Sequence, residues 1–545
     1  MKFKNHLIAM VVLSVFVLFS SASAQSPLDG VLSFVNESPV FIIVSQKTAE
    51  GFQNYQNYGI EAAFPKVAAF ASNYEKTTGI KIAEEASLTD SYVMALTDIN
   101  PLLFTFEFVS AIKVTDADKY NRFLEKWLSA WKISRSEVTN INGLKVYSLS
   151  ASEIKTPLFY VQKDNYFLSS NKLEGISRAL ETASNPSRSF VNTVSYEQIK
   201  RKFSIDSNFY LWISGKVLSN YLNLLMNMPA FTKSAENIKF EIYSNLMKEF
   251  VHGLEFVGMK LSFNQNNIGF EFFVSVNELL SKTMKARLSL VKEGADRKIY
   301  YDGTEQGSLK LIPEQASSMV SLHVAIPPFF DEMIAQHSGP DKFFDLKKAN
   351  EKAIDKFGIG LEKLVASWAG NEFFAARFEG RQFMAGAKIA DEKSLEKILD
   401  VVGSKIRKLK YRRSSVKHAG VRINIAKKDV KGEDEKLFAY FSIGEYFVVA
   451  NNIEKAKTII ETYNDKLPSI RASRGFVSSC EFVSGDKYKM VAYASIPKAV
   501  ERMSPYFNSM LNIVEIFPEK LNLKNIGFSS RADNSGQHLK INLTY

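Results

Sequence analysis

The sequence contains one cysteine, Cys480, among its 545 residues. A single thiol cannot form an intramolecular disulfide, so apolar burial and hydrogen bonding must hold the fold together. Long apolar runs are also missing after residue 24, where no uninterrupted stretch reaches the roughly 18 residues of a membrane-spanning helix. We therefore predict no transmembrane segment in the mature protein. We expect Cys480 to be buried and inert, with a reactive thiol as the alternative.

Recognisable catalytic and metal-binding motifs are missing too. The sequence has no Gly-x-Ser-x-Gly nucleophile elbow and no glycine-rich phosphate loop. After residue 24, no two histidines are three or four positions apart, the spacing of a metal-binding pair on a helix. These histidines are His252, His323, His337, His418 and His538. The sequence therefore predicts no metal, no cofactor and no enzymatic activity. A hydrolase with catalytic residues gathered from distant loops is the enzymatic alternative.

The first 24 residues have the parts of a secretory signal peptide. Lys2 and Lys4 provide a positive start, and residues 7–19 form an apolar run. The small residues 22–24, Ala-Ser-Ala, fit the cleavage pattern. We predict a signal peptide at residues 1–24 that is cleaved after Ala24. The protein is then exported, most simply to the periplasm, with an extracellular or outer-membrane-associated location as the alternative.

Two segments of the chain resemble each other. Residues 164–182 read DNYFLSSNKLEGISRALET, and residues 444–462 read GEYFVVANNIEKAKTIIET. Six of the 19 positions are identical, and most of the others exchange one apolar residue for another. A looser correspondence extends on both sides of these segments. The pattern predicts an internal duplication.

The predicted fold is therefore two tandem copies of an α+β unit, at residues 31–276 and 309–545. Each copy is expected to form a mainly antiparallel sheet with helices packed on one side. Strand-like segments with alternating apolar residues are interspersed with helical segments, which favours this class. Residues 277–308 are predicted to hold a helix, at residues 278–291, followed by a linker.

The residues that the two copies share have roles in folding. The equivalent pairs are Asp116 with Asp391, Gly143 with Gly420, and Asn171 with Asn451. The aspartates are predicted to cap helix N-termini, and the glycines to adopt positive φ in tight turns. The asparagines are predicted to end a strand and cap the next helix. The duplication therefore predicts two similar folded units and no repeated active site.

Three regions of the second copy are similar to a known family. Residues 311–313 (Leu-Ile-Pro) precede a strand, and residues 447–451 (Phe-Val-Val-Ala-Asn) precede a helix. Residues 357–361 (Phe-Gly-Ile-Gly-Leu) lead to residues 368–372 (Trp-Ala-Gly-Asn-Glu). On these segments the second copy resembles the bacterial domain of unknown function 3352 family. The first copy resembles it more faintly and has no counterpart of residues 368–372. The resemblance implies an exported envelope protein and supplies no catalytic residues.

One segment of the second copy, residues 405–418, is strongly basic. Its cations are Lys405, Arg407, Lys408, Lys410, Arg412, Arg413 and Lys417. We predict a candidate anion-binding patch for phosphate or carboxylate groups, since arginines can contact either in a bidentate manner. The alternative is the solvated face of a strand and loop.

The net charge is +11, and removal of Lys2 and Lys4 with the signal peptide leaves +9. Because the protein is expected to be exported, we predict no nucleic acid partner for this charge. The expected partners are an anionic envelope polymer or lipid surface, or an unidentified envelope protein.

We predict a non-enzymatic cell-envelope protein that acts by binding or scaffolding through its two units. The first alternative is a periplasmic carrier or sensor of an apolar ligand. Its site would be a cleft between the units, lined by some of the 42 phenylalanines. The second alternative is the hydrolase with dispersed catalytic residues.

Overall fold

The computed structural model describes the larger part of the chain. The described residues are 28–46, 53–54, 65–100, 105–151, 157–202, 209–217, 219–220, 253–264, 266–277, 306–323, 346–360, 364–365, 367–408, 411–428, 436–480, 488–495, 524–533 and 536–544. The predicted signal peptide and the predicted helix at residues 278–291 lie outside them.

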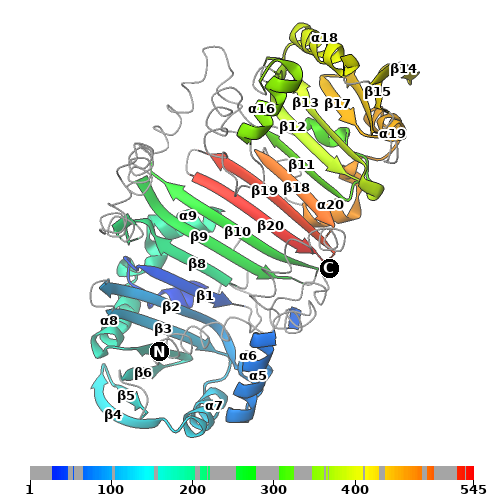
Figure 1. Cartoon of the computed structure of the whole chain (residues 1–545). Coiled ribbons are helices and arrows are strands. Elements are labelled where there is room, and N and C mark those ends of the chain that lie inside the picture. Colours follow the sequence, from blue (N-terminus) through cyan, green and yellow to red (C-terminus); the bar gives the residue numbers. More distant parts are fainter. Residues whose placement is uncertain are drawn as a thin grey trace.

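The described strands form one antiparallel sheet of 20 strands (Figure 1). From one edge to the middle, the first ten are β4 (Ser134–Ile141), β5 (Leu144–Ser150), β6 (Leu158–Lys163), β7 (Tyr166–Ser170), β3 (Thr105–Val114), β2 (Thr89–Asn100), β1 (Phe41–Gln46), β8 (Phe209–Ser214), β9 (Leu254–Phe263) and β10 (Asn267–Val276). From the middle to the other edge follow β20 (Gly536–Thr544), β19 (Asn525–Asp533), β18 (Met490–Ser495), β11 (Ser318–His323), β12 (Ala369–Arg377), β13 (Phe383–Ile389), β17 (Tyr446–Ala450), β16 (Lys436–Ile443), β15 (Val421–Lys428) and β14 (Arg412–His418).

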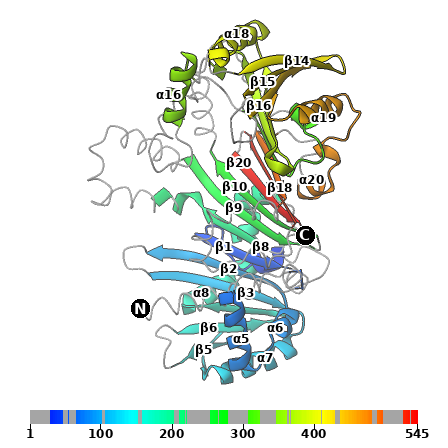
Figure 2. The same ribbon diagram turned by 45° about the vertical axis from the view of Figure 1, so that its right-hand side comes forward.

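The two halves of the sheet meet at β10 and β20. These strands pair over nine residues each, from Asn267 opposite Thr544 to Ser275 opposite Gly536. The strand order, counted outward from this join, is the same in both halves: each strand within residues 41–276 has a counterpart at the same position among the strands of residues 318–544. The last strand of the chain, β20, therefore lies in the middle of the molecule (Figures 1 and 2). The edges of the described sheet are β4 and β14.

Helices lie beside the strands. The α-helices described are α2 (Leu28–Leu32), α5 (Pro65–Thr78), α6 (Ile82–Leu88), α7 (Ala117–Ala130), α8 (Leu173–Ser184), α9 (Val194–Lys202), α16 (Leu346–Phe357), α18 (Glu392–Lys408), α19 (Ile453–Tyr463) and α20 (Arg474–Ser479). The 3-10 helices are η1 (Pro186–Arg188), η2 (Phe190–Asn192), η4 (Gly307–Lys310), η5 (Glu379–Arg381) and η6 (Ile470–Ala472). With the sheet they make a mixed fold, as the sequence predicts.

In the first half, helices cover both faces of the sheet. Ile176 of α8 shares a buried core with Leu168 of β7. Tyr120 of α7 packs on Phe167, the preceding residue of β7, with ring centroids 4.5 Å apart. Neighbouring residues of a strand point to opposite faces, so α8 and α7 lie on opposite sides of the sheet.

The second half has the same arrangement. Ile459 of α19 belongs to the core that contains Val448 of β17. Leu395 of α18 packs with Phe447, the residue of β17 that precedes Val448. The prediction of helices on one side is therefore wrong. Successive residues of these strands are apolar, so both faces must be covered to remove them from water.

The fold contains the helix caps and turn glycines that the sequence predicts. The Oδ1 atom of Asp116 accepts from the backbone N–H of Lys119 at 3.0 Å, and Asp391 caps α18 through the N–H of Ser394 at 3.1 Å. Both predicted aspartate caps are thus confirmed. The predicted positive φ is also confirmed, with 82° at Gly143 and 85° at Gly420.

The asparagines have another role than the predicted one. The N-caps of α8 and α19 are Lys172 and Asn452, which directly follow Asn171 and Asn451 in the chain. The side-chain oxygen of Asn171 instead accepts from the N–H of Phe108 in β3. Asn451 accepts from Phe383 in β13 in the same way. Each asparagine thus continues the hydrogen bonding of the sheet by one residue beyond its own strand.

Candidate functional site

The basic segment is divided between a helix and an edge strand. Lys405, Arg407 and Lys408 lie in the last turns of α18. Arg412, Arg413 and Lys417 lie on β14, which is exposed from Arg412 to Lys417. Lys410 lies outside the described residues.

The register of β14 against β15 adds cations that the basic segment does not contain. Lys417 is opposite Arg422, and Arg412 is opposite Lys427. The Lys428 ammonium lies 5.7 Å from the centroid of the Tyr411 ring. The hairpin formed by β14 and β15, which we call the basic edge, is therefore more cationic than the sequence segment alone. Only strand pairing brings these residues together.

The Arg413 side chain is exposed but has partners in the fold. Its guanidinium donates to the Tyr440 hydroxyl at 3.2 Å. It also lies against Gly403 of α18, where an added Cβ would come within 2.6 Å of Nη1. In the first half, Arg135 of β4 donates in the same way to Tyr160 at 3.0 Å. Arg413 therefore helps to pack α18 on the sheet, and we leave it out of the anion-binding group.

A second charged group lies where the halves of the sheet join, and we call it the junction cluster. Glu271 of β10 contacts Lys260 of β9 at 3.1 Å. From β20, Lys540 approaches the same carboxylate at 3.4 Å and His538 at 3.2 Å. Arg531 of β19 donates from Nε to Nδ1 of His538. The proton of a neutral His538 is then on Nε2, from which it donates to Glu271.

The electrostatics of the junction cluster favour an ionised carboxylate. Burial by itself would raise the pKa of Glu271. The hydrogen bond from His538 and the charges of Lys260 and Lys540 outweigh it and bring the pKa to about 2. For His538, burial lowers the pKa and outweighs the opposing effect of Glu271. The cluster is a salt-bridge network that ties β9, β10 and β20 together.

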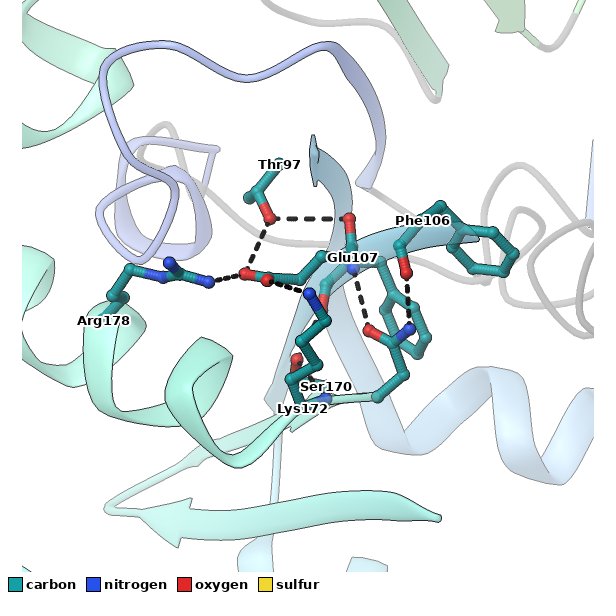
Figure 3. Close-up of polar contacts among 8 residues, drawn as sticks. Thr97, Phe106, Glu107, Ser170, Lys172 and Arg178 are labelled. Carbon is teal, nitrogen blue, oxygen red and sulfur yellow. Dashed lines mark hydrogen bonds and ion pairs between the residues drawn. The ribbon is translucent and has the colours of Figure 1, made fainter. Parts of the chain in front are cut away.

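A buried carboxylate also occurs in the first half (Figure 3). The Glu107 side chain of β3 is 4% exposed and lies 3.1 Å from the Lys172 ammonium. Arg178 of α8 also pairs with it, and the Thr97 hydroxyl donates to it at 3.1 Å. Lys172 and Arg178 are about half exposed. Two cations thus neutralise one carboxylate and fix the start of α8 on the sheet, which is a structural role.

An apolar pocket lies in the first half, among α2, β1, η2, α9 and β8. Ile42, Val44, Phe190 and Trp212 contribute to its lining. Its space is ≈ 30 Å³, which is room for one or two water molecules. The buried Nε1 of Trp212 has no hydrogen-bond partner among the residues that the structure describes. The pocket does not lie between the halves, where β10 and β20 are directly paired.

Among the described residues, the candidate catalytic groups lie apart from one another. Cys480 is 2% exposed, as predicted, and burial raises its pKa to about 12, so it stays a thiol at neutral pH. Within the described ranges, no three His, Cys, Asp or Glu side chains gather as a metal site. No described helix is long and apolar enough to span a membrane.

No protein-family model matches the chain, and no curated protein matches it. Solved structures that resemble part of it include crystal forms IV, III and I of TP0453, each 11% identical. They cover 48%, 49% and 49% of this chain and 84%, 88% and 87% of TP0453, with TM-scores of 0.27, 0.27 and 0.25. TM-scores this low do not establish a shared fold.

Proposed function

We propose that this chain is an exported, non-enzymatic cell-envelope protein, built from two tandem copies of one α+β unit, that binds anionic surfaces through its basic edge. The equal order of strand pairing on both sides of the β10–β20 join supports the tandem copies. The signal-peptide pattern of residues 1–24 supports export. The resemblance to the domain of unknown function 3352 family agrees with an envelope location.

The observation that carries this proposal is the difference between the two edges of the sheet. At the β4 edge, cations are paired with carboxylates, since Arg135 contacts Glu125 and Lys145 contacts Glu137 at 3.0 Å. At the β14 edge, Lys417 faces the cation Arg422 across the strand pair. Like charges in facing positions repel each other. A polyanion would relieve that repulsion.

The ligand groups that fit are phosphates or carboxylates repeated along a surface. Each Lys or Arg near an anionic membrane contributes about 1 kcal/mol, and salt weakens the attraction. A lipid headgroup layer and an acidic polysaccharide both present such groups. Both sources present the same kind of anionic group, one on lipid headgroups and the other on a polysaccharide chain.

The test compares two variants that each lose four positive charges. The edge variant is Arg412→Gln, Lys417→Gln and Arg422→Gln on the basic edge, with Arg407→Gln on the neighbouring α18. The control variant is Lys76→Gln, Lys81→Gln, Arg122→Gln and Arg201→Gln, all at exposed positions of the first half. Binding is measured by co-sedimentation with phosphatidylcholine vesicles, with and without phosphatidylglycerol, and in parallel by binding to polygalacturonate.

We expect the edge variant to lose on the order of 1,000-fold in affinity for one of the two anionic probes, because four cations contribute about 1 kcal/mol each. The control variant should bind like the unmodified protein. Whichever probe responds identifies the source of the anion. Equal loss in both variants, or no binding of the unmodified protein to either probe, overturns the proposal.

The carrier alternative rests on the apolar pocket near Trp212. At ≈ 30 Å³ its space is too small for an acyl chain unless the surrounding helices move. Native mass spectrometry of protein purified from its own envelope tests this alternative. Extra mass that is lost on denaturation would support a carrier, and the bare chain mass would count against one.

A further inference from the structure

The outer side of β14 is a regular strand edge. Within the described part of the chain, β14 pairs with β15 alone. The pairing runs without a bulge from Arg412 opposite Lys427 to His418 opposite Val421. The other edge differs, because the pairing of β4 with β5 is interrupted between Glu137 and Thr139. Bulges protect edges from further pairing, so only the β14 edge has no such protection.

The turn of the hairpin determines which backbone groups face outward. His418 and Val421 flank the two-residue loop Ala419-Gly420, in which both φ angles are positive. In a loop of this kind the flanking residues form a hydrogen-bonded pair. Hydrogen-bonded pairs alternate with non-hydrogen-bonded pairs along the strands. The backbone N–H and C=O groups at positions 413, 415 and 417 therefore point away from β15.

Charge determines which strand fits beside β14. Two copies of β14 paired antiparallel about Ser415 would place Arg413 opposite Lys417, and facing like charges destabilise a strand pair. A second copy of this chain is therefore a poor occupant. An extended segment with acidic side chains would place carboxylates opposite Arg412 and Lys417 of β14. Its main chain would hydrogen-bond to the outward groups at positions 413, 415 and 417.

We propose that the β14 edge binds an extended acidic peptide segment of a protein partner by strand addition. Main-chain hydrogen bonds would provide the binding energy, and the cations would select acidic sequences. This docking mode requires free backbone groups, whereas the binding of anionic surfaces proposed above requires only the side-chain charges. The two proposals can therefore fail independently.

The test uses a substitution that removes one outward N–H and keeps every charge. Ser415→Pro does this, and proline is tolerated at an edge position whose N–H faces solvent. Ser415→Ala keeps the N–H and is the matched control. The probe is a labelled peptide, Thr-Glu-Val-Glu-Val-Glu-Thr, acetylated and amidated at its ends, with the lysine analogue as the charge control. Binding is measured by fluorescence anisotropy.

We expect Ser415→Pro to weaken binding of the acidic peptide at least tenfold and Ser415→Ala to leave it unchanged. The lysine peptide should not bind. Ser415→Pro should bind phosphatidylglycerol vesicles or polygalacturonate like the unmodified protein. Equal peptide affinity of the proline and alanine variants would overturn strand addition, and so would failure of the acidic peptide to bind the unmodified protein.

Two further measurements keep the test decisive if the proline variant folds poorly. In peptides N-methylated at alternate residues, only one of the two methylation patterns should abolish binding, because a strand presents its amides to one side at every second residue. Hydrogen exchange of the unmodified protein should slow at Arg413, Ser415 and Lys417 when the peptide is added. It should not change at Ser414 and Val416, which already face β15. If neither methylation pattern abolished binding, that result would contradict the proposal.

Discussion

At the scale of single residues, the junction cluster ties three neighbouring strands together through the carboxylate of Glu271. Glu271 is 12% exposed and contacts three groups on neighbouring strands. A charge in such a place is costly unless it is paired, and removing one partner of a buried pair leaves the others uncompensated. The pKa of about 2 for Glu271, in place of 4.5, shows that its partners more than offset the cost of burial.

We predict that stability falls in acid through Glu271. Its pKa is lowered in the folded state, so its contribution is complete above pH 4.5 and is lost as the pH falls toward 2. The shift corresponds to about 3 kcal/mol at neutral pH. Glu271→Gln should therefore destabilise the protein at pH 7, and the difference should shrink toward zero near pH 2. Denaturant unfolding across this pH range measures it.

The control for this prediction is Glu137→Gln, which removes an ion pair that is about half exposed. Such pairs contribute little, so its unfolding curve should stay close to that of the unmodified protein. A Glu271→Gln variant with a constant loss of stability from pH 7 to pH 2 would show that ionisation is not the cause.

At the scale of elements, the two edge hairpins differ in their turns. The first half joins β4 to β5 through Asn142-Gly143, with φ of 53° and 82°. The second half uses Ala419-Gly420, with φ of 46° and 85°. Asparagine and glycine adopt positive φ readily, whereas alanine does so at a cost. The basic edge therefore has the less favourable turn of the two.

We predict opposite effects of two substitutions in these turns. Ala419→Asn should stabilise the β14–β15 hairpin by about 1 kcal/mol, and Asn142→Ala should destabilise the β4–β5 hairpin by a similar amount. Hydrogen exchange of the amides in each hairpin measures local opening. Exchange near residue 419 should slow about fivefold and exchange near residue 142 should accelerate as much. Changes of the same sign in both hairpins would contradict this account.

At the scale of the whole molecule, β20 joins two halves that would otherwise each end in an open edge. It pairs with β10 on one side and with β19 on the other, over nine residues each. Its backbone groups are therefore bonded on both sides, unlike those of β14. Long open edges invite pairing between molecules. The central position of β20 protects both halves.

We predict that the same substitution has very different effects in these two strands. Ile541→Pro removes a ladder hydrogen bond in the middle of the sheet and should cost about 3 kcal/mol or more. Ser415→Pro at the edge should cost much less. Thermal unfolding compares the variants, and light scattering detects aggregation from exposed edges of β10 and β19. Similar melting temperatures for both variants would show that β20 is dispensable for stability.

The sequence by itself determined the local features of this protein. Asp116 caps its helix and Gly143 turns its hairpin because each interaction spans only a few residues, so a short pattern suffices to predict it. The mixed α and β composition follows from apolar periodicity for the same reason. The predicted basic segment also contains the β14 part of the basic edge. It does not contain Arg422 and Lys427, which lie on β15.

Only the tertiary structure decided how these pieces meet. It joined β10 to β20, so that Glu271 lies beside His538, 267 positions later in the chain. It placed helices on both faces of the sheet and made β14 an edge. The physical reason is that strand order and register are set by pairing between distant segments, whose energy depends on the whole sheet. A pattern read within one segment does not contain that information.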